Sequence, residues 1–156
     1  MSIAVFDVDG VVADVRHRLH YIERRPKNWA GFFLAAKNDP PVREGLALAA
    51  ELAQRHEIVW LTGRPGWLRD ITETWLRSHD LPGNELRMRG DHDHRPARLF
   101  KLADLGGLAP RTIAAFVDDD VEVVAAATEA GFRAVLADWL PQAETLRDAQ
   151  ERLGRS

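Results

Sequence analysis

Residues 3–10 read IAVFDVDG: four apolar residues, then two aspartates separated by a valine, then a glycine. The apolar part, Ile3–Phe6, is short and contains β-branched side chains, which is typical of a buried β-strand. Asp7 ends it abruptly, and a carboxylate at the end of a buried strand needs a cation or hydrogen bonds to replace its lost hydration. Gly10 permits the tight turn that would bring Asp7 and Asp9 into one pocket. The stretch therefore predicts a strand that leads into a polar site.

The same pattern of strand followed by polar residues recurs along the chain, with helical segments between the strands. Further strands are predicted at residues 58–61, 86–88, 112–117 and 134–136, and helices at residues 44–55, 67–79, 98–105, 121–130 and 142–153. Alternation of this kind indicates a parallel sheet covered by helices on both faces. We therefore predict a three-layer α/β/α, Rossmann-like fold with a central parallel sheet of about five strands.

Three of the predicted strands end in polar residues, namely Asp7, Thr62 and Asp118. Right-handed crossovers place the carboxyl ends of parallel strands along one edge, where open α/β sheets bind ligands. Residues 14–43 form the longest stretch without clear periodicity, and we predict a flap or small helical insert beside that edge. The whole chain, residues 1–156, is predicted to form a single domain.

Composition narrows the class of protein. The hydrophobic fraction of 46%, the charged fraction of 29% and the net charge of −3 are typical of an ordinary globular protein rather than one coated in positive charge. The absence of cysteine excludes disulfides, thiol catalysis and cysteine-ligated zinc. No apolar run of about 18 residues and no leader segment is visible, so we expect a cytoplasmic protein without a membrane partner.

One local concentration of charge runs against the overall balance. Five basic residues face a single acid, Glu23, between residues 16 and 27: Arg16, Arg18, Arg24, Arg25 and Lys27. Such a cluster can bind an anionic ligand, and it can equally be a solvated surface loop. The sequence leaves both interpretations open.

Asp118, Asp119 and Asp120 follow the strand predicted at residues 112–117. Adjacent carboxylates suit Mg²⁺, which prefers hard oxygen ligands, although acids also favour helix N-termini, and Asp120 is predicted to be a helix cap. A metal ion held here together with Asp7 would let an anionic nucleophile approach an anionic phosphate. Asp-x-Asp-Gly alone is also common in loops and calcium sites, so the first aspartates do not decide between these chemistries.

Thr62, Gly63 and Arg64 follow the second predicted strand and supply a hydroxyl, a backbone N–H that a ligand can approach closely, and a guanidinium group that can grip phosphate. Lys101 is the remaining candidate cation, with an ordinary surface lysine as the alternative. Trp60, Trp67 and Trp75 are predicted to lie in the core. Trp29 and Tyr21, in the aperiodic stretch, are better candidates for stacking on a base, with core packing the alternative for Trp29.

Taken together, these elements resemble the four motifs of the haloacid dehalogenase-like (HAD) superfamily, in family order. The first motif corresponds to Asp7–Val12, the second to Thr62, the third to Lys101 and the fourth to Asp118-Asp119. The resemblance covers roughly residues 3–136. It implies a HAD fold with only a small cap, and the activity of a Mg²⁺-dependent phosphatase.

By the same resemblance, Asp7 is the nucleophile that takes the phosphoryl group, and Asp9 protonates the leaving group and later activates water. Thr62 donates to a phosphate oxygen, and Lys101 stabilises charge on the nucleophile and the phosphate. The family holds Mg²⁺ through the carboxylate of the nucleophile, the backbone carbonyl two residues later and the fourth-motif acid. These correspond here to Asp7, Asp9 and Asp119, with Asp118 assisting.

A narrower resemblance is to the phosphatase half of bacterial and phage polynucleotide kinase/phosphatases. The residues that carry it are Asp9–Asp14, His17–Tyr21, Trp29, Phe32-Phe33, Thr62–Pro65, Met88-Arg89 and Asp93–Pro96. It implies that Arg18 and Arg64 assist phosphate binding. The chain differs from these enzymes in lacking the kinase P-loop and in carrying Ala97 where they often have an acid four residues before the lysine.

The expected function is hydrolysis of a phosphomonoester, on a nucleic-acid 3′-phosphate end or a nucleotide, through an aspartyl-phosphate intermediate. The alternative within the class is a small-molecule phosphatase that acts on nucleoside monophosphates or sugar phosphates. The alternative from a different class is a phosphate-binding domain without catalytic activity.

Overall fold

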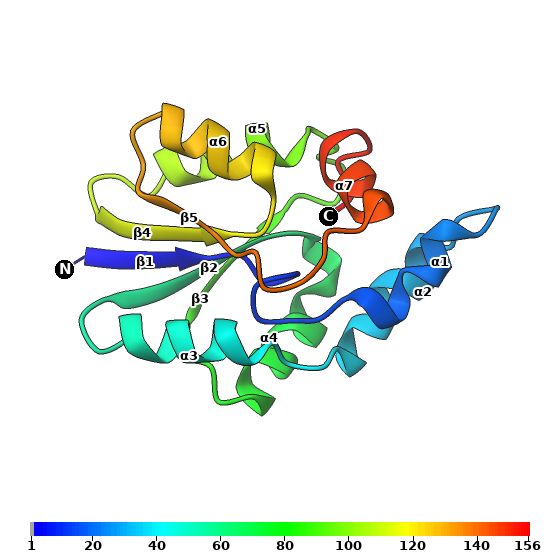
Figure 1. Ribbon diagram of the computed structural model, residues 1–156, viewed down its shortest axis with the longest axis horizontal. Helices are drawn as coiled ribbons and strands as arrows, with labels where there is room; N and C mark the ends of the chain where they lie inside the picture. Colours follow the sequence, from blue (N-terminus) through cyan, green and yellow to red (C-terminus); the bar gives the residue numbers. More distant parts are fainter. Residues whose placement is uncertain (1) are drawn as a thin grey trace.

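The computed structural model describes residues 2–156 and is built around a parallel five-stranded sheet (Figure 1). Strand order is β3-β2-β1-β4-β5, and every pairing is parallel. The strands are β1 (Ser2–Phe6), β2 (Glu57–Pro65), β3 (Glu85–Arg89), β4 (Thr112–Asp118) and β5 (Ala134–Leu136). The prediction of a parallel sheet of about five strands is therefore confirmed.

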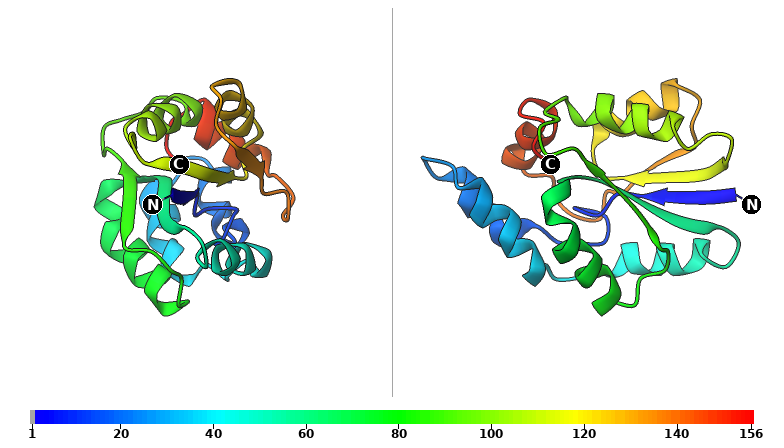
Figure 2. Two further views of the ribbon diagram at one scale, coloured as in Figure 1. Left: turned by 90° about the vertical axis from the view of Figure 1, so that its left-hand side faces the viewer. Right: turned by 180° about the vertical axis from the view of Figure 1, so that it is seen from behind.

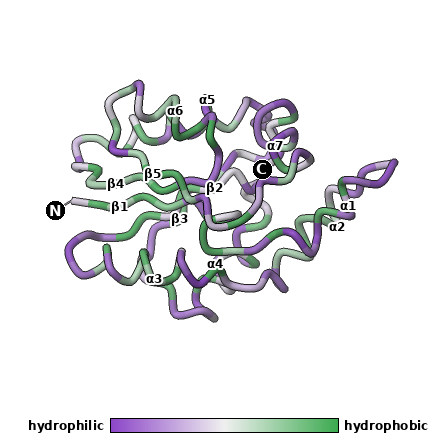
Figure 3. The backbone as a smooth tube through the Cα atoms, in the orientation of Figure 1, coloured by the Kyte–Doolittle hydropathy of each residue, from purple (hydrophilic) through white to green (hydrophobic). Residues whose placement is uncertain are grey.

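Helices cover both faces of the sheet, which gives the three predicted layers (Figures 1 and 2). One face is covered by α3 (Arg43–Leu52) and α4 (Arg69–Ser78), the other by α5 (Ala97–Gly106) and α6 (Val121–Glu129). Each face has its own apolar core. Ala49 and Trp75 pack on the first face, and Phe100 and Val123 on the second. Figure 3 shows β1 and much of β2 as hydrophobic, between these two layers of helices.

Residues 14–43, which we call the insert, project beyond the carboxyl edge of the sheet (Figure 1). The insert contains two short α-helices, α1 (His20–Glu23) and α2 (Trp29–Leu34), and two 3-10 helices, η1 (Arg16–Arg18) and η2 (Ala35–Asn38). Asn28 caps α2 by accepting a hydrogen bond of 2.9 Å from the Gly31 N–H.

A third apolar cluster joins the insert to the final helix, α7 (Glu144–Glu151). Ile22 and Phe32 of the insert pack in this cluster with Leu146 and Ala149 of α7. The tip of the α1–α2 hairpin, by contrast, is hydrophilic (Figure 3).

The direction of chain progression reverses between β1 and β4. The chain passes from β1 outward to β2 and β3, then returns to the other side of β1 with β4 and β5. Neighbouring strands at such a reversal have connections that diverge to opposite faces, which leaves a crevice at their carboxyl ends. β1 leads directly into Asp7 and β4 ends in Asp118, so both residues lie at this crevice.

Two local predictions are wrong. β2 does not end before Thr62 but continues to Pro65, because Pro65 pairs with Arg89 after a shift of register that follows Thr62. Trp67 is not a core residue, since its exposed fraction is 49%. It lies in the 3-10 turn η3 (Gly66–Leu68) ahead of α4, so the apolar face of that helix does not extend to it.

Candidate active site

Three carboxylates from neighbouring strand ends form the centre of the site. Asp7, Asp118 and Asp119, here called the carboxylate cluster, each offer an oxygen within 4.8 Å of the others, and all three residues are buried. The Asp7 N–H donates to the Val117 carbonyl at 2.9 Å, which continues the β1–β4 pairing past the end of β1. Sheet pairing thus fixes the first and fourth motifs against each other.

The turn after Asp9 brings the backbone close to Asp119. Gly10 has φ +79°, a conformation that favours glycine, and its N–H donates to the Ala13 carbonyl at 2.8 Å. A Cβ at residue 10 would lie 2.0 Å from Oδ2 of Asp119. Glycine at this position therefore serves both the turn and the close approach of the two motifs.

Lys101 reaches the cluster from α5. Its Nζ lies 2.5 Å from Oδ2 of Asp118 and 3.1 Å from Oδ1 of Asp7, and the residue is buried. Burial alone would lower the pKa of Lys101, but Asp118 and Asp7 outweigh burial and raise it. Ala97, one turn earlier, is also buried. In this chain Lys101 is therefore positioned by Asp7 and Asp118, and no acid at residue 97 is needed to position it.

The cluster carries more negative charge than its protein partners neutralise. With all three carboxylates ionised, the single ammonium group of Lys101 would leave two negative charges. Burial, opposed by Lys101 and reinforced by Asp118, raises the pKa of Asp7 from 3.8 to about 7. Burial and the neighbouring Asp7 raise the pKa of Asp119 well above its ordinary value.

A divalent cation fits this arrangement. Oδ1 of Asp119 is buried and has no hydrogen-bond partner among residues 2–156. Hard carboxylate oxygens are the donors that Mg²⁺ prefers, and a double positive charge would balance the cluster. The donor chemistry, the orphaned oxygen and the excess charge therefore agree with the metal expected from the resemblance, with Asp7, Asp118 and Asp119 as side-chain donors.

A second group of charges surrounds Asp9. Arg18 and Arg64, here called the arginine pair, are fully buried and both donate to Oδ1 of Asp9, at 3.1 Å from Arg18 Nη2 and 2.6 Å from Arg64 Nη2. Burial alone would raise the pKa of Asp9, but Arg64 and Arg18 outweigh it and lower the pKa to about 2. Asp9 is therefore a carboxylate at neutral pH.

Asp39 completes this group and was not expected from the sequence. It is buried and accepts from Arg18 Nε at 2.8 Å, from Arg64 Nη2 at 3.1 Å, and lies 2.6 Å from Nε2 of His17. Two carboxylates thus balance the two guanidinium groups. A buried arginine needs an anionic partner. Burial of both Arg18 and Arg64 therefore requires a second acid besides Asp9.

The last residues of β2 bring Thr62 and Gly63 to the same crevice. Thr62 is buried, and its Oγ1 accepts from the Arg64 N–H at 3.1 Å. The Gly63 carbonyl accepts from Nε of Arg89 at 3.0 Å. Arg89 is itself buried, and burial lowers its pKa to about 10, so it remains charged at neutral pH. Like Asp39, Arg89 is a charged residue near the site for which no role was predicted from the sequence.

Asp120 has a different position from its two neighbours. Its Oδ1 accepts from the backbone N–H groups of Glu122 and Val123, at 2.9 and 3.4 Å, and it caps α6. The prediction that Asp120 is a helix cap is confirmed.

Three other basic residues of the insert lie farther from the two charged groups. Arg16 is exposed and pairs with Asp14, and Arg24 and Arg25 follow α1 at the exposed hairpin tip.

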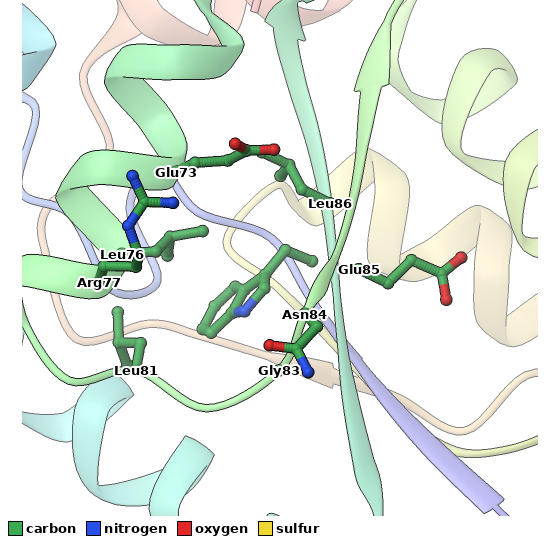
Figure 4. Close-up of a pocket in the computed structure, with 9 residues that line it drawn as sticks. Glu73, Leu76, Arg77, Leu81, Gly83, Asn84, Glu85 and Leu86 are labelled. Atoms are coloured by element: carbon green, nitrogen blue, oxygen red, sulfur yellow. The ribbon is translucent and has the colours of Figure 1, made fainter.

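A pocket away from the crevice has no member of either charged group. It lies at the edge strand β3, where Trp60 and Leu86 meet α4, and polar residues such as Glu73 and Arg77 line its rim (Figure 4). β3 is separated from β1 by β2, so this pocket is not part of the site described above.

Comparison with known proteins identifies the fold. No protein-family model matches the chain. A chain from a solved structure of the Pnkp1/Rnl/Hen1 complex superposes with a TM-score of 0.70 at 21% identity, over 87% of this chain and 46% of that one. A haloacid dehalogenase-like hydrolase from Streptococcus pneumoniae gives 0.59 at 14% identity, over 87% of this chain and 84% of that one. The class C acid phosphatase of Bacillus anthracis gives 0.59 at 12% identity, over 95% and 77%.

The chain therefore has the HAD fold, and the predicted resemblance is confirmed at that level. A short sequence match is to a Halalkalibacterium halodurans protein provisionally described as a nucleotidase, with 35% identity over 43 residues, or 28% of this chain and 22% of that protein. The chain spans less than half the length of the matched chain of that complex, and the sequence match spans about a fifth of the Halalkalibacterium halodurans protein. No helix among residues 2–156 is long and apolar enough to cross a membrane.

Proposed function

We propose that the protein is a HAD-type phosphatase that hydrolyses a phosphomonoester on a nucleic-acid 3′ end or a nucleotide. The observation that carries the proposal is the carboxylate cluster with Lys101 in contact with it, at the point where strand order reverses. The names of the structural neighbours and of the sequence match support the substrate class. We include the cytoplasm in the proposal, and the absence of cysteine is compatible with that compartment.

In the proposed reaction, Asp7 attacks phosphorus and forms an aspartyl phosphate. Bound Mg²⁺ would neutralise charge on the carboxylate and the phosphate, with Asp7, Asp118, Asp119 and the Asp9 carbonyl as ligands. Lys101 lies 3.1 Å from Asp7 and supplies further positive charge beside the nucleophile. Thr62 and the Gly63 N–H, at the end of β2, bind phosphate oxygens.

Asp9 moves the proton in this scheme. The arginine pair holds its side chain as an anion, the form that accepts a proton from water when the aspartyl phosphate is hydrolysed. An incoming phosphate dianion competes with Asp9 for Arg18 and Arg64. Weaker contacts from these arginines would raise the pKa of Asp9, which would let it protonate the leaving oxygen.

The test is release of inorganic phosphate by the purified protein with Mg²⁺. The substrates are a 3′-phosphorylated oligonucleotide, a 5′-phosphorylated oligonucleotide, nucleoside monophosphates and β-glycerophosphate. We expect the fastest turnover on the 3′-phosphorylated oligonucleotide and a loss of at least about a thousandfold in Asp7→Asn. Asp148→Asn, on the outer helix α7, is the matched control and should retain turnover.

Three outcomes count against parts of the proposal. Asp7→Asn activity within about tenfold of the wild type would remove Asp7 as nucleophile. Faster turnover of nucleoside monophosphates than of either oligonucleotide would favour the nucleotidase alternative. Phosphate binding without release from any substrate would favour a non-catalytic phosphate-binding domain.

A further inference from the structure

The segment Gly154–Ser156, which follows α7, lies in the crevice against the residues proposed to bind phosphate. Ser156 is buried, and its Oγ donates to Oδ2 of Asp9 at 3.3 Å. A Cβ at Gly63 would lie only 2.2 Å from the Ser156 carbonyl carbon. The Ser156 carbonyl also accepts from Nη2 of Arg89 at 3.4 Å. The chain itself thus fills the space beside Asp9 and Gly63.

The contact between Ser156 and Asp9 indicates where the leaving alcohol of a substrate would lie. In the proposed reaction Asp9 exchanges a proton with the oxygen of the departing alcohol. The Ser156 hydroxyl is an alcohol and donates to Asp9 in the same manner. The segment Gly154–Ser156 therefore occupies the position that the leaving alcohol would take.

With the segment in place, the groove along it has a volume of only about 30 Å³, so an aromatic ring can enter only when Gly154–Ser156 leaves. Phe33, Pro65 and Trp67 line it together with Arg89, Asp91 and His94, and the segment itself contributes Gly154 and Arg155. The Trp67 indole is 49% exposed and packs edge-on against Phe33, with ring centroids 5.8 Å apart. Trp67 is held in place through its backbone N–H, which donates to Asp91 at 2.9 Å. An exposed, fixed indole beside the Arg89 guanidinium is a stacking platform for a nucleobase.

We propose that this groove is the subsite for the nucleoside that adjoins the scissile phosphate, and that Trp67 stacks on its base. The segment Gly154–Ser156 and the nucleoside exclude each other, so the segment leaves when substrate binds. This inference rests on the proposed phosphatase function and narrows it to esters whose alcohol is a nucleoside.

The first test compares Michaelis constants for a nucleoside 3′-monophosphate and for β-glycerophosphate, which has no ring. Trp67→Ala should raise the ratio of the two constants about tenfold, the effect of losing one stacked base, and Trp67→Phe should restore most of it. Leu99→Ala, an exposed apolar residue on α5, is the control and should leave both constants unchanged. A ratio within about twofold of wild type in Trp67→Ala would overturn the assignment.

The second test displaces the segment by a point substitution. Gly154 has φ +57°, and a Cβ there would lie 2.0 Å from the His94 carbonyl oxygen. Gly154→Val should therefore expel the segment and lower the Michaelis constant for the nucleotide, with an unchanged circular dichroism spectrum. A higher constant in a folded Gly154→Val protein would mean that the segment helps to bind the substrate, which contradicts the proposal.

Binding of a product-like trinucleotide with a 3′-hydroxyl, followed by calorimetry, separates this inference from the phosphatase proposal. Affinity about tenfold weaker in Trp67→Ala than in wild type supports the subsite even when no substrate is turned over. Equal affinity in the two proteins overturns the subsite even when the phosphatase is active.

Discussion

Replacing Asp39 by alanine should lower the free energy of unfolding more than replacing an acid on the surface does. Asp39 is fully buried and accepts hydrogen bonds from both arginines, Arg18 and Arg64. Its loss leaves two buried guanidinium groups with Asp9 as their shared counterion. Removing one partner of a buried ion pair costs about 3–5 kcal/mol, against a total free energy of unfolding of about 5–15 kcal/mol for a domain.

The assay is equilibrium unfolding in urea. With a slope of about 2 kcal/mol per molar, a loss of about 4 kcal/mol lowers the midpoint by about 2 M. Asp148→Ala is the control, because Asp148 and Arg152 form a partly exposed pair on α7 and such pairs contribute about 0.5 kcal/mol or less. A double variant, Arg18→Leu with Asp39→Leu, should lose less than the sum of the two single variants, since it removes one charge of each sign. A loss below about 1 kcal/mol in Asp39→Ala would refute the reasoning.

Three further predictions concern metal, pH and the arginine pair. Asp119→Ala should weaken Mg²⁺ binding, measured by calorimetry, far more than Asp120→Ala, because Asp120 caps α6. If Asp120→Ala weakened binding more, Asp120 and not Asp119 would be the metal ligand. Without metal, the folded protein holds protons on Asp7 and Asp119 more tightly than the unfolded chain does, so stability should fall as pH rises from about 4 to about 7. Mg²⁺ should therefore raise the melting temperature more at about pH 8 than at about pH 5.5, and an equal rise at both would contradict this linkage. Arg64→Lys should lower kcat/KM about tenfold or more, because an ammonium group cannot reproduce the paired contacts of Nε and Nη2 with Asp9; full activity would remove Arg64 from the proposed site.

The sheet and the meeting of Asp7 with Asp118 could be predicted because both follow from local pattern. Apolar β-branched runs alternate with helical periods, and parallel crossovers then bring the strand ends together. The roles of Asp39 and Trp67 could not be predicted in this way. Asp39 lies in the aperiodic insert, and only tertiary folding brings it to Arg18 and Arg64. Trp67 continues the apolar spacing of α4 in sequence, but the helix begins at Arg69.

The shared cluster of the insert and α7 affects the order in which the chain can complete its structure during synthesis. Ile22 and Phe32 leave the ribosome more than a hundred residues before Leu146 and Ala149, their partners in that cluster. Until α7 emerges, the insert has an uncovered apolar surface, which is the kind of surface that chaperones bind and that favours aggregation. The arginine pair and Asp9 adjoin this surface through Arg18, whose guanidinium lies 4.4 Å from the centre of the Phe32 ring. A nascent chain that has produced all four motifs thus still lacks the helix that covers the apolar surface of the insert.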